Sequence, residues 1–316
     1  MSDAIDRAED IRPGPRQRLG EAIAAVNRVI LGKSAQIDLA FSALLAGGHL
    51  LIEDLPGVGK TTLAHALAHV LHLQYRRIQF TSDLLPADVL GASIFERDSS
   101  TFRFHPGPVF AELVLADEIN RAPPKTQSAL LEAMEEEQVT IEGQTRALPD
   151  PFFVIATQNP REQAGTYPLP ESQLDRFLMC LSLGFPDTDA ERELLSGRDR
   201  RHLIRDMEAV LDPARLRELQ ARAETIHVAP AILDYVQALL AASRDGDRFV
   251  AGLSPRAGLS LIAAARAWAL LAERDYVLPE DIQTVLGPVV DHRLQSLESG
   301  DQGTPGEWLR TEVPLP

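Results

Sequence analysis

The sequence predicts an α/β domain followed by a smaller all-helical domain. The stretch HLLIEDLPGVGKTTL, residues 49–63, reads as an apolar strand, a glycine-containing loop and the start of a helix. Two further apolar runs, ELVLADEIN at 112–120 and PFFVIAT at 151–157, read as buried strands that deliver polar residues at their carboxyl ends. After about residue 185 the strand-like runs stop, and the remaining chain reads as four or five helices.

The loop between the first strand and its helix has the chemistry of a phosphate cradle. A triphosphate needs backbone N–H groups facing one concavity, a helix amino terminus behind them and a cation on its outer phosphates. Lys60 is placed for the β- and γ-phosphates, and the Thr61 hydroxyl for Mg²⁺. The strict P-loop pattern has glycine where this chain has Asp54; the alternative is an ordinary turn, which the adjacent Gly-Lys-Thr disfavours. The predicted ATP-binding residues are Pro56, Gly57, Val58, Gly59, Lys60, Thr61, Thr62 and Asp117.

Two adjacent acids, Asp117 and Glu118, end a predicted buried strand at the edge where ligands bind in open α/β sheets. We expect Asp117 to hold Mg²⁺ together with Thr61, and Glu118 to polarise the water that attacks the γ-phosphate. Asn159 follows the next buried strand and is predicted to orient that water or to contact the phosphate. The simpler alternative for Asn159 is that it starts a turn with Pro160, and both roles are compatible.

Two arginines are further candidates for the reaction. Arg176 lies between a short predicted helix and the fifth strand, without an obvious partner in its own P-loop. It either makes a structural ion pair or serves the phosphate of a neighbouring subunit. Arg256 lies just inside a helix that begins at Ser254-Pro255, and we expect it to reach back towards the nucleotide.

Composition narrows the class of protein. The chain has 316 residues and a formal net charge of -15, which argues against a protein that coats nucleic acid. Its one cysteine, Cys180, excludes an internal disulfide and a thiolate metal cage. No stretch approaches ~18 uninterrupted apolar residues, and the amino terminus lacks a hydrophobic secretion core, so we expect a cytoplasmic protein without a membrane segment.

The predicted organisation has four parts. Residues 1–18 are polar and are expected to form a flexible arm, residues 19–185 the nucleotide-binding domain, and residues 186–298 the helical domain. Residues 299–316 contain three prolines and two glycines after Gly300 and are expected to form a flexible tail. Two β-hairpins are predicted in the first domain, one from the strand-like runs ASIFE at 92–96 and TFRFH at 101–105, and one from the alternating run QVTIEGQTRAL at 138–148.

The order of these motifs resembles the MoxR family of AAA+ ATPases. The P-loop and first hairpin are followed by DEINRAPPKTQSALLEAMEE, the second hairpin, ATQNPREQAGTYPLPESQLDRF and a helical region opening with LSPRA. Of these, INRAPPK and GTYPLPESQLDRF are far more restrictive than a P-loop. The resemblance runs from about Leu19 to Leu297, which is nearly the whole chain.

The resemblance implies a role for each candidate residue. It makes residues 57–62 the Walker A motif, in a family that commonly has Glu-Asp before it, and makes Asp117 and Glu118 Walker B. It makes Asn159 sensor 1. It makes Arg176 an arginine finger acting across a subunit boundary and Arg256 sensor 2. Two points stay open. Arg121 and Arg161 are alternatives to Arg176 as the arginine that acts across a subunit boundary. Arg256 serves either the nucleotide of its own chain or that of a neighbour.

The resemblance also implies an architecture and an activity. The implied fold is a five-stranded parallel sheet between helices, with a helical lid, assembled as a homo-oligomeric, typically hexameric, ring. The implied function is Mg-dependent ATP hydrolysis that drives chaperone-like remodelling or maturation of a client protein, including metal-centre insertion, with a partner that has a von Willebrand factor A domain. Two alternatives are a nucleotide-gated binding switch with negligible turnover and a nucleic-acid motor, which the mixed charges of the hairpins disfavour.

Overall fold

The centre of the molecule is a sheet of five parallel strands, which confirms the predicted fold class. The computed structural model describes residues 15–160, 165–197, 200–246, 248–297 and 303–316. In spatial order the strands are β2 (Tyr75–Gln79), β5 (Leu113–Asp117), β8 (Phe153–Gln158), β1 (His49–Glu53) and β9 (Phe177–Leu181). Because β1 lies between β8 and β9, the loop that follows it emerges near the middle of the sheet's carboxyl edge.

Helices cover both faces of this sheet, so its strands are apolar on both sides. Leu50 and Ile52 of β1 join the core under α1 (Pro15–Val29), α2 (Ser34–Leu45) and α3 (Lys60–Val70). Leu51, which points the other way, joins the core under α4 (Pro86–Leu90) and α5 (Pro124–Glu136). Successive side chains of a strand point to opposite faces, which accounts for the continuous hydrophobic runs in the sequence.

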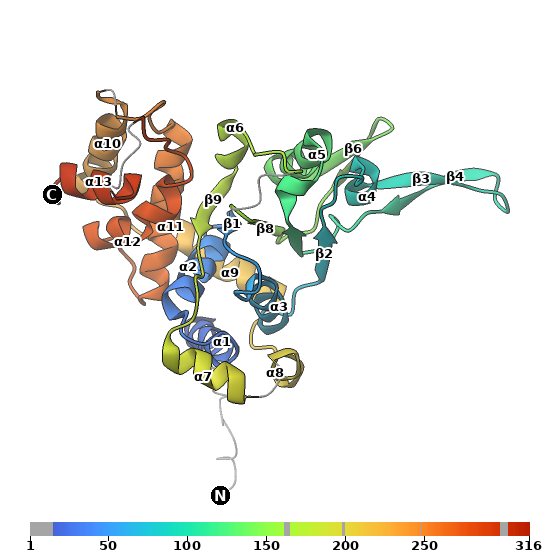
Figure 1. Cartoon of the computed structure of the whole chain (residues 1–316), viewed down its shortest axis with the longest axis horizontal. Helices are drawn as coiled ribbons and strands as arrows, with labels where there is room; N and C mark the ends of the chain where they lie inside the picture. The colour runs from blue at the N-terminus through green and yellow to red at the C-terminus, as the bar shows by residue number, and fades with distance from the viewer. Residues whose placement is uncertain (1–14, 161–164, 198–199, 247, 298–302) are drawn as a thin grey trace, which may run out of the picture.

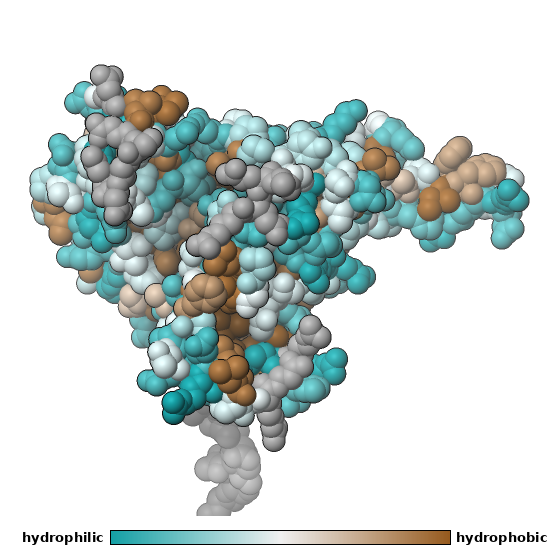
Figure 2. Space-filling model, in the orientation of Figure 1, coloured by the Kyte–Doolittle hydropathy of each residue, from teal (hydrophilic) through white to brown (hydrophobic). Residues whose placement is uncertain are grey.

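Both predicted hairpins are present. The first pairs β3 (Gly91–Glu96) with β4 (Thr101–Pro106), and the second pairs β6 (Gln138–Ile141) with β7 (Gln144–Ala147). Figure 1 shows the first hairpin extending far from the sheet and its helices. Hydrophobic side chains remain exposed on it, as Figure 2 shows; Phe102, for example, is 71% exposed and packs edge to face against Phe95.

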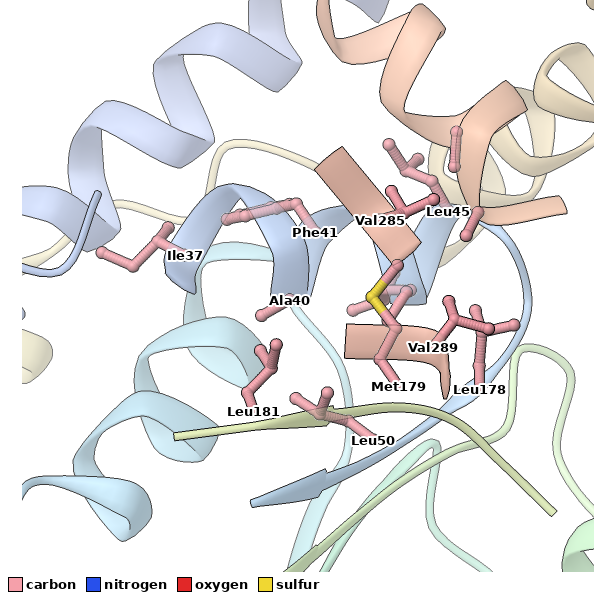
Figure 3. Close-up of a cluster of buried hydrophobic side chains, with 14 of the residues drawn as sticks. Ile37, Ala40, Phe41, Leu45, Leu50, Leu178, Met179, Leu181, Val285 and Val289 are labelled. Atoms are coloured by element: carbon pink, nitrogen blue, oxygen red, sulfur yellow. The ribbon is translucent and has the colours of Figure 1, made fainter. Parts of the chain in front are cut away.

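The chain after β9 is helical, with more helices than the four or five expected. The described part contains α7 (Thr188–Ser196), α8 (Arg200–Asp206), α9 (Pro213–Glu224), α10 (Pro230–Arg244), α11 (Pro255–Leu271), α12 (Pro279–Val290) and α13 (Pro305–Glu312). These helices do not stand apart from the first domain. Val285 and Val289 of α12 pack with Met179 of β9 and with α2 in one hydrophobic cluster, as Figure 3 shows.

The prediction of a flexible tail is wrong for residues 303–316, which include a packed helix. Thr304 caps α13 by accepting a hydrogen bond from the Glu307 N–H, and Pro305 occupies the first turn, where proline is favourable. Leu309 is completely buried, and Trp308 packs edge to face against Phe249. Prolines and glycines that suggested a loop therefore start a helix whose apolar side covers the helical domain.

The expected arm at the other end was too long. Helix α1 begins at Pro15 rather than near Leu19, and the Arg16 guanidinium donates to the Asp275 carboxylate in the loop before α12. Residues 1–14 lie outside the described part of the chain.

Candidate nucleotide site

The loop after β1 has the backbone of a phosphate cradle. Gly57 and Gly59 have φ angles of 85° and 102°, in the region that side-chain-bearing residues rarely adopt. Apart from the adjoining residues of the loop, no atom of the described chain lies within 4 Å of where a Cβ would sit on either glycine. Gly59 precedes Lys60, the first residue of α3, so the unpaired N–H groups of the helix start face this open space.

The residues predicted to bind ATP and Mg²⁺ lie around one pocket of about 270 Å³. Three separate strands supply them, because β1 leads into the P-loop, β5 ends at Asp117 and β8 leads to Asn159. The lining residues are Pro56, Gly57, Gly59, Lys60, Thr61, Thr62, Asp117, Glu118 and Asn159. Of the predicted nucleotide ligands, Val58 instead lines the neighbouring apolar pocket.

The two acids at the end of β5 are held in a polar network. Asp117 is 8% exposed; it accepts a hydrogen bond from the Thr157 hydroxyl at 2.6 Å and pairs with the Arg77 guanidinium at 2.6 Å. Glu118 accepts from the Gln79 amide at 3.1 Å and pairs with the Arg121 guanidinium at 2.9 Å. Both carboxylates are thus fixed at the pocket by side chains from β2, β8 and the turn after β5.

The donor set fits a magnesium-bound triphosphate. Mg²⁺ is usually held by one or two carboxylates, substrate phosphates and water, and Thr61 and Asp117 offer a hydroxyl and a carboxylate in the same pocket as Lys60. Among the described residues, no cluster of three or more His, Cys, Asp or Glu side chains is arranged to hold a metal without such a ligand.

An apolar pocket of about 460 Å³ adjoins the phosphate pocket and shares Gly57, Gly59 and Thr62 with it. It lies between the α1–α2 joint, the P-loop and the segment that leads into α7. Its other lining residues are Val29, Ile30, Leu31, Lys33, Val58, Phe185, Pro186, Glu191, Leu194, Leu195 and Arg200. An apolar cavity beside a phosphate cradle fits the base and sugar of a nucleotide.

Sequence reasoning missed this apolar pocket. Its walls come from segments that are distant in the chain, and each is an unremarkable apolar stretch when taken alone. The one available signal was the run VILGKS at 29–34, which lies just upstream of the P-loop.

Asp54, the residue that departs from the strict P-loop pattern, links the loop to the segment after β9. Its carboxylate accepts from the N–H groups of Leu55 at 2.8 Å and Gly184 at 2.6 Å, and from the Ser182 hydroxyl at 3.1 Å. Burial alone would raise the pKa of this carboxyl, but these hydrogen bonds outweigh burial and lower its pKa. Its backbone carbonyl also accepts from the Lys60 ammonium at 2.5 Å.

Arg176 and Arg256 do not line the phosphate pocket. Arg176 directly precedes β9, and Phe177 of β9 is opposite His49, the first residue of β1. The arginine therefore lies at the amino edge of the sheet, whereas the P-loop leaves the carboxyl edge. The five residues of β1 span about 17 Å, which is further than an arginine side chain reaches.

Both arginines instead meet one acid at that amino edge. Arg176 pairs with Glu135 at 2.7 Å, and Arg256 of α11 pairs with the other oxygen of the same carboxylate at 3.1 Å. Glu135 lies in the last turn of α5, a helix that begins after the carboxyl end of β5 and runs back to the amino edge. The expectation that Arg256 contacts the nucleotide of its own chain therefore receives no support from this arrangement.

Of the two arginines that compete with Arg176 for the role across a subunit boundary, the structure describes one. Arg121 lies at the carboxyl edge and pairs with Glu118, beside its own phosphate pocket. Arg161 lies outside the described residues.

Comparison with known proteins identifies the family. The family described as "ATPase family associated with various cellular activities (AAA)" matches residues 49–179, and the AAA lid domain matches residues 241–311. Chaperone MoxR1 from Mycobacterium tuberculosis is 44% identical, over 87% of this chain and 75% of that protein. This chain belongs to the MoxR family of AAA+ ATPases.

Other relatives match over most of the chain. Protein MoxR from Paracoccus denitrificans is 35% identical over 88% of each chain, and the uncharacterized protein YeaC from Bacillus subtilis is 47% identical over 96% of this chain and 94% of YeaC. A crystal structure of a protein from Cytophaga hutchinsonii, described as a "putative ATPase", has a TM-score of 0.85 at 36% identity, over 94% of this chain and 93% of that one. Within the described part of this MoxR protein, no helix has the length and apolar content needed to cross a membrane.

Proposed function

We propose that this protein hydrolyses ATP as a ring, most simply a hexamer, in which each nucleotide is held between two subunits. One observation carries the proposal. The cradle, the acids and Asn159 lie at the carboxyl edge of the sheet, while Arg176 lies at the amino edge, about one strand length away. A head-to-tail contact between two copies brings opposite edges together, and repeating that contact by rotation closes a ring.

In this proposal the chain's own residues divide the reaction among them. Lys60 and the N–H groups of the P-loop bind the phosphates, and Thr61 and Asp117 would hold Mg²⁺, which supplies charge neutralisation when it is bound. Glu118 accepts the proton of the attacking water, and Asn159 orients that water. Arg176 of the adjacent subunit stabilises the negative charge that develops on the transferred phosphoryl group.

Glu118 must first leave the partners it has in this structure. Its carboxylate is shared by Arg121 and Gln79, and both bonds compete with a hydrogen bond to water. Nucleotide binding is therefore expected to rearrange these two side chains before turnover. If Glu118 stays paired when ATP is bound, the protein is the alternative, a binding switch with negligible turnover.

Hydrolysis is proposed to drive chaperone-like work in the cytoplasm. The relative from M. tuberculosis is named a chaperone, and the exposed aromatic residues of the β3–β4 hairpin offer a surface for a polypeptide. The family resemblance suggests a client undergoing maturation, such as insertion of a metal centre, and a partner with a von Willebrand factor A domain.

The test compares nucleotide binding with phosphate release in two variants. Lys60→Ala is expected to abolish ATP binding, measured by calorimetry. Glu118→Gln is expected to keep ATP affinity within about threefold and to lose at least about 100-fold in turnover, because it removes the base but not the cradle. Equal turnover in Glu118→Gln and the unmodified protein would contradict the role of Glu118, and an absence of phosphate release in the unmodified protein at all concentrations would favour the switch.

A further inference from the structure

Glu135 occupies an unusual position between two arginines that come from different domains. Arg176 leads into the edge strand β9, and Arg256 lies in the first turn of α11 in the helical domain. Each guanidinium contacts a different oxygen of the Glu135 carboxylate, at 2.7 Å and 3.1 Å. One carboxylate therefore brings the two cationic groups to the same place at the amino edge of the sheet.

Among the described residues, Glu135 is the acid that pairs with both guanidinium groups. The neighbouring acid, Asp175, is already engaged by the buried Arg293 guanidinium at 2.7 Å and by the Ser254 hydroxyl at 3.3 Å. Arg293 is 4% exposed, so this second ion pair is a fixed internal one. By contrast, the side chains of Arg176, Arg256 and Glu135 all keep contact with solvent, so their bonds can be exchanged for bonds to an arriving anion.

We propose that Glu135 competes with the phosphate of the neighbouring subunit's nucleotide for binding to Arg176 and Arg256. In the separate chain its carboxylate binds the two guanidinium groups in the way a phosphate would, with one oxygen on each arginine. When an adjacent subunit presents its nucleotide, the arginines exchange Glu135 for the phosphate oxygens. This inference rests on the proposed function, because it requires that Arg176 and Arg256 face a neighbour's nucleotide.

Competition of this kind raises the concentration needed for assembly. Two partly exposed ion pairs must be lost for each interface, and a carboxylate that remains nearby repels the incoming phosphate. Removing the charge of Glu135 should therefore favour the assembled state by about fivefold in concentration, a size set by the small value of exposed ion pairs. The rate of each completed site should change little, because Glu135 does not take part in the chemistry.

The test measures assembly against protein concentration by sedimentation velocity, with and without the non-hydrolysable analogue AMP-PNP. Glu135→Gln is expected to reach half-assembly at about one-fifth of the concentration of the unmodified protein when AMP-PNP and Mg²⁺ are present, and to show a smaller change without them. Glu136→Gln, which removes the adjacent charge, is the matched control and should behave as the unmodified protein. Glu135→Ala should shift assembly in the same direction, and thermal unfolding of each variant verifies that it is folded.

A double-variant comparison isolates the mechanism. In a chain that already carries Arg176→Ala and Arg256→Ala, Glu135→Gln should have no effect on assembly, because the competition no longer exists. Higher half-assembly concentrations in Glu135→Gln, or values equal to those of Glu136→Gln, would overturn the inference. The proposed function fails separately, when Arg176→Ala leaves phosphate release at the level of the unmodified protein.

Discussion

Replacing Asp54 with alanine should destabilise the nucleotide domain, because this carboxylate joins the P-loop to the segment after β9. Asp54 is 7% exposed, and its side chain accepts three hydrogen bonds, two of them from backbone N–H groups. Hydrogen bonds to a charged group contribute about 1.5–3 kcal/mol each. After truncation, water can replace the bond to the exposed Ser182, so the loss is smaller than the sum over three bonds. We therefore expect Asp54→Ala to lower the free energy of unfolding by about 3 kcal/mol in all.

The pH dependence gives this prediction a second, independent signature. The folded state lowers the pKa of Asp54, so its contribution to stability is complete above the pKa of about 4 that the unfolded chain has. The contribution is lost as pH falls through the lower pKa of the folded state. The gap in stability between the unmodified protein and Asp54→Ala should be constant from pH 7 to about 5 and should shrink below about pH 4.

Urea unfolding followed by circular dichroism at several pH values measures both effects. Asp234→Ala, which removes an exposed acid from α10, is the control and should change the free energy of unfolding by less than about 0.5 kcal/mol. A loss below about 1 kcal/mol in Asp54→Ala, or a gap that does not change with pH, would show that Asp54 does not hold the two segments together. Weaker ATP binding is expected to accompany the loss, because the carboxylate that is removed holds the N–H group of Leu55 in the P-loop.

Three further changes test other parts of the structure. Leu309→Ala should lower the free energy of unfolding by about 2–5 kcal/mol in thermal or urea unfolding, because it leaves a cavity at a completely buried site under α13. A change near zero would indicate that this segment is a flexible tail after all. Phe185→Ala should weaken ATP binding by roughly tenfold in calorimetry, because it removes part of the apolar wall beside the phosphate cradle. Unchanged affinity would show that the adenine base binds elsewhere. Burial lowers the pKa of the His49 imidazole to about 4 in the folded protein, whereas the unfolded chain binds this proton near pH 6.5. The free energy of unfolding should therefore decrease by about 3 kcal/mol as pH falls from about 6.5 to 4. His49→Gln should flatten that part of the stability curve if the variant remains folded.

The elements that sequence reasoning found are those in which neighbouring residues carry the signal. The strands β1, β5 and β8 are short apolar runs, each with its polar residues directly after it, so the acids and Asn159 were correctly placed at one edge. Parallel strands then bring those residues together without further information. The inserted hairpins were visible for a similar reason, since alternation and a polar turn lie within about a dozen residues.

The features that were missed depend on contacts between distant segments. Residues 303–316 read as a tail because Pro305 and Gly306 signal a loop, and only the fold reveals that Leu309 has a buried site to fill. The partner of Asp54 lies 130 residues away at Gly184, and the apolar pocket joins three stretches of chain. Sequence reasoning also left the partner of Arg176 open, because Glu135 is one of several equivalent acids in EAMEEE until α5 is placed against β9 and α11.

The central claim is that each catalytic site is shared by two subunits, and mixing two inactive variants tests it most directly. Lys60→Ala cannot bind ATP but keeps Arg176, whereas Arg176→Ala keeps the cradle and lacks the arginine. In equimolar mixed rings, about one quarter of the interfaces join an intact cradle to an intact Arg176. The account predicts that phosphate release recovers towards this fraction of the unmodified rate. Activity no higher than the sum of the two separate variants, at a concentration where rings form, would contradict a shared site.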